Sequence, residues 1–353
     1  MLETETASKG PVTASGVGQG RAAEPLVTVE DLRVRLVSRD QNLSLLQGVS
    51  FTLKEGEVLC LLGESGSGKT VTVRSLMRLL PPSAQVSGKI NIGGTDILAL
   101  KPRQLRQVRG GLISMIFQEP ATALDPTFTI GNQIAETIRV HENVSQAEAR
   151  KRALNLLEMV QVPSAARRLD AYPHELSGGL RQRAMIALAL SSRPKVLIAD
   201  EPTTALDATV QIQVLLLLRE LQRELGMATI FVTHDVGVAC EIADKVAVMY
   251  SGRFVETGTI DDVLAAPAHP YTSGLLHAVV NSEARGTRLT PIPGAPPDLS
   301  SLPPGCSFAP RCPRVQSACN DRVPDLVEVS DGHASRCILA RDLSLQGTQE
   351  LRQ

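Results

Sequence analysis

The segment that most constrains the fold is "VLCLLGESGSGKT", residues 58–70. An apolar run leads into Gly63, four residues separate Gly63 from Gly68, and Lys69, Thr70 and the helical pattern "VTVRSLMRLL" follow. A strand, a glycine-rich turn and a helix in this order form a phosphate-binding loop, because backbone amides and the positive end of the helix face phosphate oxygens. We therefore predict an α/β fold with a bound nucleotide, in which Lys69 contacts the terminal phosphates and Thr70 binds magnesium.

Polar residues follow three further apolar runs in the sequence. "PKVLIADEP" ends in Asp200, which would hold the magnesium shell, and in Glu201, which would polarise an attacking water. "IFVTHD" ends near His234 and "LISMIFQEP" ends near Gln118. Parallel strands that end in polar groups form the crevice in which open α/β sheets bind ligands. The sequence thus predicts that these side chains meet at one edge of a sheet.

A second candidate anion site lies in "HELSGGLRQRAMIALAL". Ser177, Gly178 and Gly179 precede a helical pattern, and a helix start attracts phosphate. A serine-capped helix would explain the same residues without any ligand. At this point the chain resembles the ATP-binding cassette (ABC) family, whose LSGGQ signature lies just upstream of the strand that ends in Asp-Glu. The fifth residue here is Leu180 instead of glutamine.

The resemblance extends over about residues 26–340 and implies a role for each motif. The phosphate loop would consist of Gly63, Glu64, Ser65, Gly66, Ser67, Gly68, Lys69 and Thr70. Glu201 would be the catalytic base, His234 the switch histidine, and Gln118 the glutamine that senses the γ-phosphate. Thr70, Gln118 and Asp200 would hold Mg²⁺.

The resemblance also divides the site between two chains. Ser177, Gly178 and Gly179 would serve ATP bound to the opposite subunit, and Asp207 would communicate across the dimer. By this resemblance, two such subunits meet head to tail with ATP between them, and hydrolysis of ATP allows the closed dimer to open. Family members stack an aromatic ring on adenine, whereas the matching position here is Leu36, which predicts an apolar contact in place of the ring.

Composition excludes several classes of protein. A net charge of −1 with 21% charged residues offers no general positive field for nucleic acid. No stretch approaches the roughly 20 apolar residues of a membrane-spanning helix, and the first 25 residues lack the apolar centre of a secretory signal. We expect a cytoplasmic protein without disulfides, in which Cys60 and Cys240 fill the core.

Changes of pattern along the chain suggest three parts. We predict a disordered tail over residues 1–25, an ABC nucleotide-binding domain over 26–282, and a small, loop-rich, cysteine-rich extension over 283–353. Helical periodicity predicts a helical subdomain over about 121–180, inserted between Gln118 and the signature. The alternation of strands and helices makes the main domain an α/β P-loop NTPase.

Four cysteines gather in the extension. Cys306, Cys312, Cys319 and Cys337 are separated by five, six and seventeen residues, which is wider than the paired spacing usual for structural zinc. A segment with little core of its own gains stability from a metal centre. The stretch "PPGCSFAPRC" resembles the C-terminal domain of the oligopeptide, dipeptide and nickel branch of the family, which implies a 4Fe-4S cluster. Zn²⁺ and unligated thiols remain alternatives.

The resemblance implies the ATP-hydrolysing subunit of a bacterial peptide importer. Its partners would be a second ABC ATPase subunit, in a heterodimer, two transmembrane permease subunits and an extracytoplasmic solute-binding protein. It would lie at the cytoplasmic face of the inner membrane. Nickel or another small polar solute is an alternative cargo. A soluble ABC ATPase acting on DNA or ribosomes is a less favoured alternative, because the chain has no basic stripe.

Overall fold

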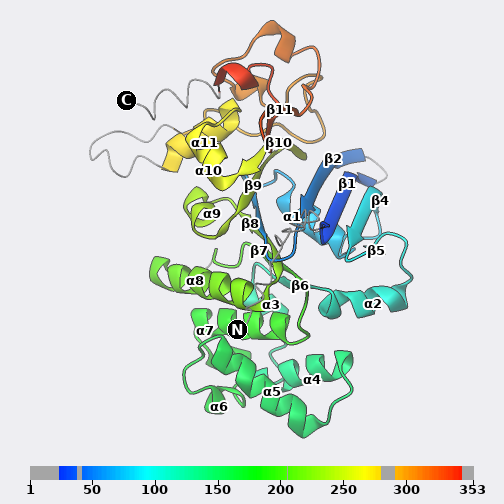
Figure 1. Cartoon of the computed structure of the whole chain (residues 1–353), viewed down its shortest axis with the longest axis vertical. Helices are drawn as coiled ribbons and strands as arrows, with labels where there is room; N and C mark the ends of the chain where they lie inside the picture. The colour runs from blue at the N-terminus through cyan, green and yellow to red at the C-terminus, as the bar shows by residue number, and fades with distance from the viewer. Residues whose placement is uncertain (1–23, 38–41, 205, 280–290, 344–353) are drawn as a thin grey trace, which may run out of the picture.

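The computed structural model describes residues 24–37, 42–204, 206–279 and 291–343, which form two β-sheets with helices around them (Figure 1). Most of the predicted tail, residues 1–23, lies outside the described residues, as do 283–290 and 344–353 of the predicted extension. Among the described residues, no helix is both long enough and apolar enough to cross a membrane.

The larger sheet has the strand order β11-β12-β10-β9-β3-β8-β7-β6. Its central strands are parallel, and every residue in them is buried except Lys245, the first residue of β9, which is half-buried. Burial on both faces explains why these strands are continuous apolar runs. They are β3 (Val58–Leu62), β6 (Ile113–Ile116), β7 (Val196–Asp200), β8 (Ala228–Thr233) and β9 (Lys245–Tyr250).

The register of the parallel strands brings their carboxyl ends to one edge. Leu62 of β3 pairs with Thr233 of β8, and Asp200 of β7 pairs with Val232 of β8. The phosphate loop, which continues into helix α1 (Lys69–Leu76), therefore begins beside the residues that follow β7 and β8. This edge is where an open α/β sheet binds its ligand.

The smaller sheet is antiparallel and packs beside the larger one (Figure 1). Its buried residues share a hydrophobic cluster with one face of β3, β7 and β8. The sheet has the order β2-β1-β4-β5, with β1 (Val27–Val37), β2 (Asn42–Leu53), β4 (Ala84–Ile92) and β5 (Thr95–Asp96), and helix α2 (Pro102–Gly111) follows it. In the chain, β1 and β2 precede the phosphate loop, and β4 and β5 follow helix α1.

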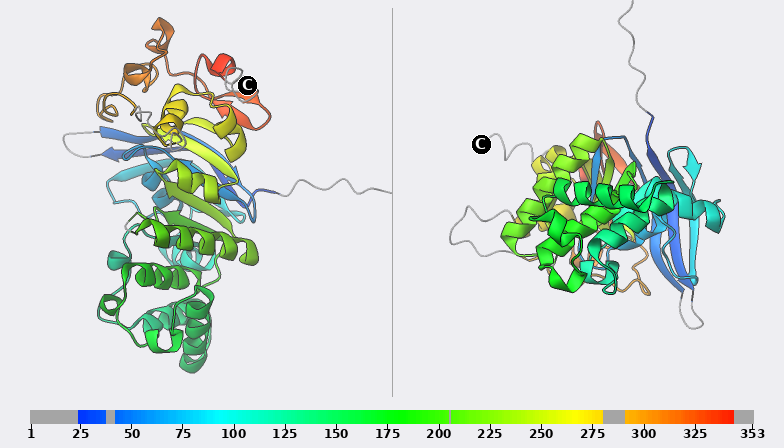
Figure 2. Two further views of the ribbon diagram at one scale, coloured as in Figure 1. Left: turned by 90° about the vertical axis from the view of Figure 1, so that its left-hand side faces the viewer. Right: turned by 90° about the horizontal axis from the view of Figure 1, so that it is seen from below.

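The chain between β6 and β7 is helical. Thr129 and Ser145 cap two of its helices by accepting hydrogen bonds from the backbone N–H groups of Asn132 and Glu148. The helices are α3 (Pro120–Ala123), α4 (Ile130–His141), α5 (Gln146–Met159), α6 (Ala165–Arg168), the 3₁₀ turn η1 (Pro173–Glu175) and α7 (Gly178–Leu190). Figure 2 shows this lobe at the end of the molecule opposite the cysteine-rich segment.

The remaining elements follow β7. They are α8 (Ala208–Leu225), α9 (Val236–Ile242), β10 (Arg253–Thr259), α10 (Ile260–Ala265), α11 (Pro270–Val279), the 3₁₀ turns η2 (Ala309–Arg311) and η3 (Ser317–Cys319), β11 (Val327–Ser330) and β12 (His333–Ser335). The last two strands extend the larger sheet, because β12 pairs with β10. The cysteine-rich segment, residues 291–343, contains the two 3₁₀ turns and these two strands, and the strands belong to the sheet of the main domain.

The two cysteines predicted to fill the core differ. Cys60 in β3 is fully buried, which confirms that prediction, and burial raises the pKa of its thiol. Cys240 in α9 is exposed, so the prediction for it is wrong. The helix buries Ala239 and Ile242, and Cys240 falls beside Glu241 on its solvent side.

Candidate nucleotide site

The phosphate loop depends on two glycines. A Cβ at Gly63 would lie 2.3 Å from the carbonyl oxygen of Met249, so a side chain cannot fit there. Gly68 has a φ of 111°, a conformation that other residues rarely adopt, and α1 begins at the next residue. The loop can therefore curl tightly between β3 and the helix and leave its backbone amides for an anion.

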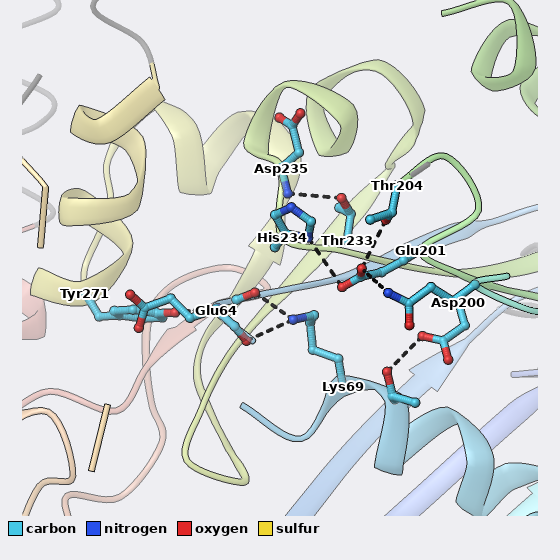
Figure 3. A network of polar contacts seen from close by, with 12 residues as sticks. Glu64, Lys69, Asp200, Glu201, Thr204, Thr233, His234, Asp235 and Tyr271 are labelled. Carbon is cyan, nitrogen blue, oxygen red and sulfur yellow. Dashed lines mark hydrogen bonds and ion pairs between the residues drawn. The ribbon is translucent and has the colours of Figure 1, made fainter. Parts of the chain in front are cut away.

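Lys69 occupies the centre of this loop (Figure 3). Its side chain is buried, and Nζ donates hydrogen bonds to the carbonyl oxygens of Gly63, at 2.7 Å, and Glu64, at 3.0 Å. Burial lowers the pKa of Lys69, whereas the nearby carboxylates of Glu201 and Asp200 act in the opposite direction. The ammonium group is thus held within the loop, where a phosphate oxygen can replace a carbonyl as its acceptor.

The residues predicted to hold magnesium lie at the start of α1 and the end of β7. Thr70 Oγ1 donates a hydrogen bond to Asp200 Oδ1 at 3.0 Å, and Asp200 is almost fully buried. Burial raises the pKa of Asp200. A hydroxyl and a carboxylate are oxygen ligands of the kind that Mg²⁺ prefers, so this pair fits the ion chemically. When bound, the ion would offset negative charge on the phosphates.

Glu201 contacts both of the other predicted catalytic residues, Gln118 and His234, and Figure 3 shows it beside His234 and Thr204. Its Oε2 accepts hydrogen bonds from Gln118 Nε2 and Thr204 Oγ1, both at 3.1 Å, and its Oε1 lies 3.4 Å from His234 Nδ1. Glu201 has a φ of 47°, which is uncommon outside glycine and marks a strained position of the kind found at functional sites. The three neighbours orient this carboxylate at the cavity, where it can accept a proton from a water molecule.

Lys69, Thr70, Gln118, Glu201 and His234 face one cavity with a volume of about 580 Å³, within the range of small-molecule sites. The predicted site residues Gly63, Ser67 and Asp200 are not in its lining. Its lining consists of Leu45, Glu64, Ser65, Gly66, Gly68, Lys69, Thr70, Val71, Gln118, Glu201, His234, Leu275 and Leu299. Leu36, the predicted contact of the base, is not in this lining and instead pairs with Leu43 and Ala84 across the smaller sheet. The apolar part of the cavity lining consists of Leu45, Val71, Leu275 and Leu299.

The predicted signature lies on a separate, exposed surface. Ser177 caps α7, where its Oγ accepts a hydrogen bond from the backbone N–H of Leu180 at 3.4 Å, and Asp207 caps α8 by accepting one from Val210 at 3.0 Å. A Cβ at Gly179 would lie 2.8 Å from Val210 Cγ1, so the starts of the two helices are in close contact. Ser177, Gly178, Gly179 and Asp207 do not line the cavity.

Two residues that contact Glu64 of the cavity lining were not identified from the sequence. Tyr271 accepts a hydrogen bond through its hydroxyl from the backbone N–H of Glu64 at 2.8 Å, and Arg311 contacts the Glu64 carboxylate. They lie 207 and 247 residues from Glu64 in the chain. No local sequence pattern could have revealed contacts over such separations.

The four cysteines of the C-terminal segment line one small pocket, together with His269 and Phe308. Backbone N–H groups donate to the Sγ atoms of Cys312, Cys319 and Cys337 at 3.4 to 3.5 Å. Burial raises the pKa of Cys306 and Cys312, and raises that of Cys337 to about 11. Four cysteine sulfurs, with backbone N–H groups directed at three of them, are the kind of ligands that hold a metal through thiolates. Within the described residues, however, no three His, Cys, Asp or Glu side chains are arranged as metal ligands.

Two family models match the sequence. The model described as "ABC transporter" matches residues 46–204, and the model described as "Oligopeptide/dipeptide transporter, C-terminal region" matches residues 255–319. The first match contains the phosphate loop and Glu201, and the second contains Cys306, Cys312 and Cys319. The two matches thus cover most of the nucleotide site, without Leu45 and His234, and three of the four cysteines.

Curated relatives align with nearly the whole chain. It is 47% identical over 318 residues to the dipeptide transport ATP-binding protein DppD of Bacillus subtilis (strain 168), with 90% of this chain and 95% of that protein covered. It is 46% identical over 337 residues to the oligopeptide transport ATP-binding protein OppD of Salmonella typhimurium (strain LT2), with 96% and 98% covered.

Solved structures resemble about two thirds of the chain. A dimeric ATP-binding cassette bound to ADP and phosphate has a TM-score of 0.60 and 28% identity, and covers 66% of this chain and 98% of its own. The protein cbiO1 of Clostridium perfringens has a TM-score of 0.59 and 31% identity, with 68% and 91% covered.

Proposed function

Because the chain belongs to the ABC transporter family as an ATP-hydrolysing subunit, we propose that it energises the import of dipeptides or oligopeptides through a membrane transporter. The observation that supports this cargo is the match to the oligopeptide/dipeptide transporter C-terminal region, together with relatives named for dipeptide and oligopeptide transport that align over 90% or more of the chain. Nickel or another small polar solute is the alternative cargo.

In the proposed cycle, Glu201 is the catalytic base at the end of β7. Its contacts with Gln118 and His234 support this role, since both side chains lie in the same cavity lining. Thr70, Asp200 and Gln118 hold Mg²⁺, and the loop from Gly63 to Thr70 holds the phosphates of ATP.

The signature serves a second subunit in this proposal. Ser177, Gly178 and Asp207 are exposed and lie outside the cavity, which supports a role for them at nucleotide bound by another chain. Closure around ATP can do work because the nucleotide binds the closed dimer more tightly than the open one.

The proposed assembly contains two different ATPase subunits, two transmembrane permease subunits and an extracytoplasmic solute-binding protein, at the cytoplasmic face of the bacterial inner membrane. We assign residues 26–282 to the nucleotide-binding domain and about 121–180 to a helical subdomain that contacts the permeases. Residues 283–353 form the C-terminal extension. The helical lobe between β6 and β7 supports this assignment.

The extension is proposed to hold a 4Fe-4S cluster through Cys306, Cys312, Cys319 and Cys337, with Zn²⁺ or unligated thiols as alternatives. The meeting of the four side chains at one pocket supports a shared ligand. Protein purified without air would be assayed for iron, acid-labile sulfide and zinc. Iron and sulfide in equal amounts support the cluster, zinc supports the alternative ion, and the absence of all three contradicts a metal centre.

Uptake by cells tests the proposed cargo. Cells that lack the native subunit would receive the wild-type chain, Glu201→Gln or the control Glu224→Gln, which changes an exposed residue of α8. Uptake of labelled dipeptides and oligopeptides is expected to disappear only with Glu201→Gln. If peptide uptake stays unchanged while nickel uptake disappears, the peptide cargo is wrong. Recovery of ribosomes or DNA without permeases would favour the soluble ATPase.

A further inference from the structure

The second residue of the phosphate loop is an acid that faces the nucleotide cavity. Glu64 lines the cavity beside Lys69, and its side chain is 28% exposed. ATP brings several negative charges to this loop, so an unpaired carboxylate at Glu64 would repel it. Glu64 therefore needs a cation if the loop is to bind a triphosphate.

That cation comes from the cysteine-rich segment. Arg311 Nη1 donates to Glu64 Oε2 at 2.7 Å, and Nη2 donates to Glu64 Oε1 at 3.0 Å. The pair is bidentate, the strongest geometry for arginine and a carboxylate. The Arg311 side chain is only 5% exposed, so solvent screens this pair weakly.

Further contacts fix the guanidinium group. Arg311 Nε donates to the carbonyl oxygen of Pro293 at 2.9 Å, and Nη1 lies 3.3 Å from the hydroxyl of Tyr250. The ring of Tyr250 packs against Tyr271 and Phe308, with centroids 4.6 Å and 5.4 Å away. The hydroxyl of Tyr271 also accepts a hydrogen bond from the backbone N–H of Glu64. Contacts from the C-terminal part of the chain thus hold both the backbone and the side chain of this loop residue.

We propose that Arg311 is a positioning residue of the nucleotide site, which neutralises Glu64 and fixes its place in the loop so that the loop binds the phosphates of ATP. The C-terminal segment is then part of the ATP site itself. The inference rests on the nucleotide site and is independent of the proposed cargo.

The electrostatic role makes a prediction that separates nucleotides. Arg311→Gln leaves the Glu64 carboxylate without its partner beside the phosphates. The affinity for ATP is expected to fall about tenfold or more, that for ADP by less, and that for adenosine hardly at all, because repulsion grows with the charge of the ligand. A loop that was merely distorted would not rank the ligands by charge.

The experiment uses the purified full chain and calorimetric titration with ATP, ADP and adenosine in the presence of magnesium. Arg311→Gln is compared with the double variant Arg311→Gln/Glu64→Gln, which removes both charges. Lys89→Gln is the control, because Lys89 forms an exposed ion pair with Glu30 in the smaller sheet. Circular dichroism checks the folding of each variant.

The double variant is expected to recover most of the ATP affinity that Arg311→Gln loses, and Lys89→Gln is expected to match the wild type. A double variant as weak as Arg311→Gln, or an equal loss for all three ligands, would overturn the proposal. If Arg311→Gln does not fold, Arg311→Lys replaces it, since lysine keeps the charge without the bidentate contact. The Arg311→Lys variant is expected to bind ATP, ADP and adenosine in the same order of affinity as the wild type and to keep most of the wild-type affinity for ATP. Loss of ATP binding in this variant would contradict the proposed neutralisation of Glu64.

Discussion

Glu256 offers a direct test of how the C-terminal segment is attached to the main sheet. This residue of β10 is fully buried, and its two carboxylate oxygens have three partners. Oε1 accepts from the backbone N–H of Ala268 at 2.6 Å and lies 2.8 Å from His333 Nε2, and Oε2 accepts from the backbone N–H of His269 at 3.0 Å. His333 belongs to β12, so the carboxylate joins the core to the segment.

The change Glu256→Gln keeps the shape of the side chain but replaces one oxygen by an NH₂ group. Whichever way the amide turns, that group faces a backbone N–H, of either Ala268 or His269, and one buried donor loses its acceptor. Such a loss costs about 1–3 kcal/mol. We therefore expect Glu256→Gln to lower the free energy of unfolding by about 2 kcal/mol, and Glu256→Ala, which removes all three contacts, by about twice as much.

Urea unfolding followed by near-ultraviolet circular dichroism would measure these values. The chain has no tryptophan and three tyrosines, and Tyr250 and Tyr271 are buried where the segment packs, so the signal reports on this region. Glu224→Gln on the exposed surface of α8 serves as the control for the loss of one charge. A Glu256→Gln protein with the same midpoint as the control would refute the reasoning.

Three further predictions concern the nucleotide site. Glu201→Gln should retain ATP binding, but its rate of ATP hydrolysis, measured by phosphate release, should fall by about a hundredfold or more. An unchanged rate would show that Glu201 is not the catalytic base. When one subunit carries both Ser177→Ala and Glu201→Gln, its partner is unchanged and each site is read separately, Glu201→Gln should impair the site at the variant's own phosphate loop and Ser177→Ala the site at the partner's loop. Impairment confined to one site would contradict the exchange of signatures. Leu299→Ala should lower the affinities for ATP, ADP and adenosine alike by about fivefold, because the apolar lining would contact the adenosine part that the three ligands share. An unchanged affinity for adenosine would mean that adenine binds elsewhere.

The parts of the site that could be predicted from sequence are those encoded by short motifs. The loop from Gly63 to Thr70 follows its strand and starts its helix, and each step is local. The meeting of Gln118, Glu201 and His234 follows from a topological rule, since each comes after a parallel strand. The solved structures confirm the α/β fold of an ABC ATPase that these motifs predicted.

The parts that were missed depend on contacts between distant segments. Arg311 and Tyr271 reach Glu64 from the C-terminal part of the chain, and nothing in their own neighbourhood indicates that partner. The strands β11 and β12 have four and three residues, too few for a pattern of alternation to identify them. Cys240 was misplaced because a seven-residue helix leaves the direction of its buried face undetermined by sequence.

The partnership of Glu64 with Arg311 has a consequence for the order in which the protein is made. The two residues are 247 positions apart in a chain of 353, so a ribosome releases the phosphate loop long before it releases the arginine. A nascent chain that stops just short of Arg311 already carries the loop, its lysine and its magnesium ligands, but its Glu64 is still without that cation. If Arg311 neutralises Glu64 as proposed, full affinity for ATP requires a chain that has been synthesised at least as far as Arg311.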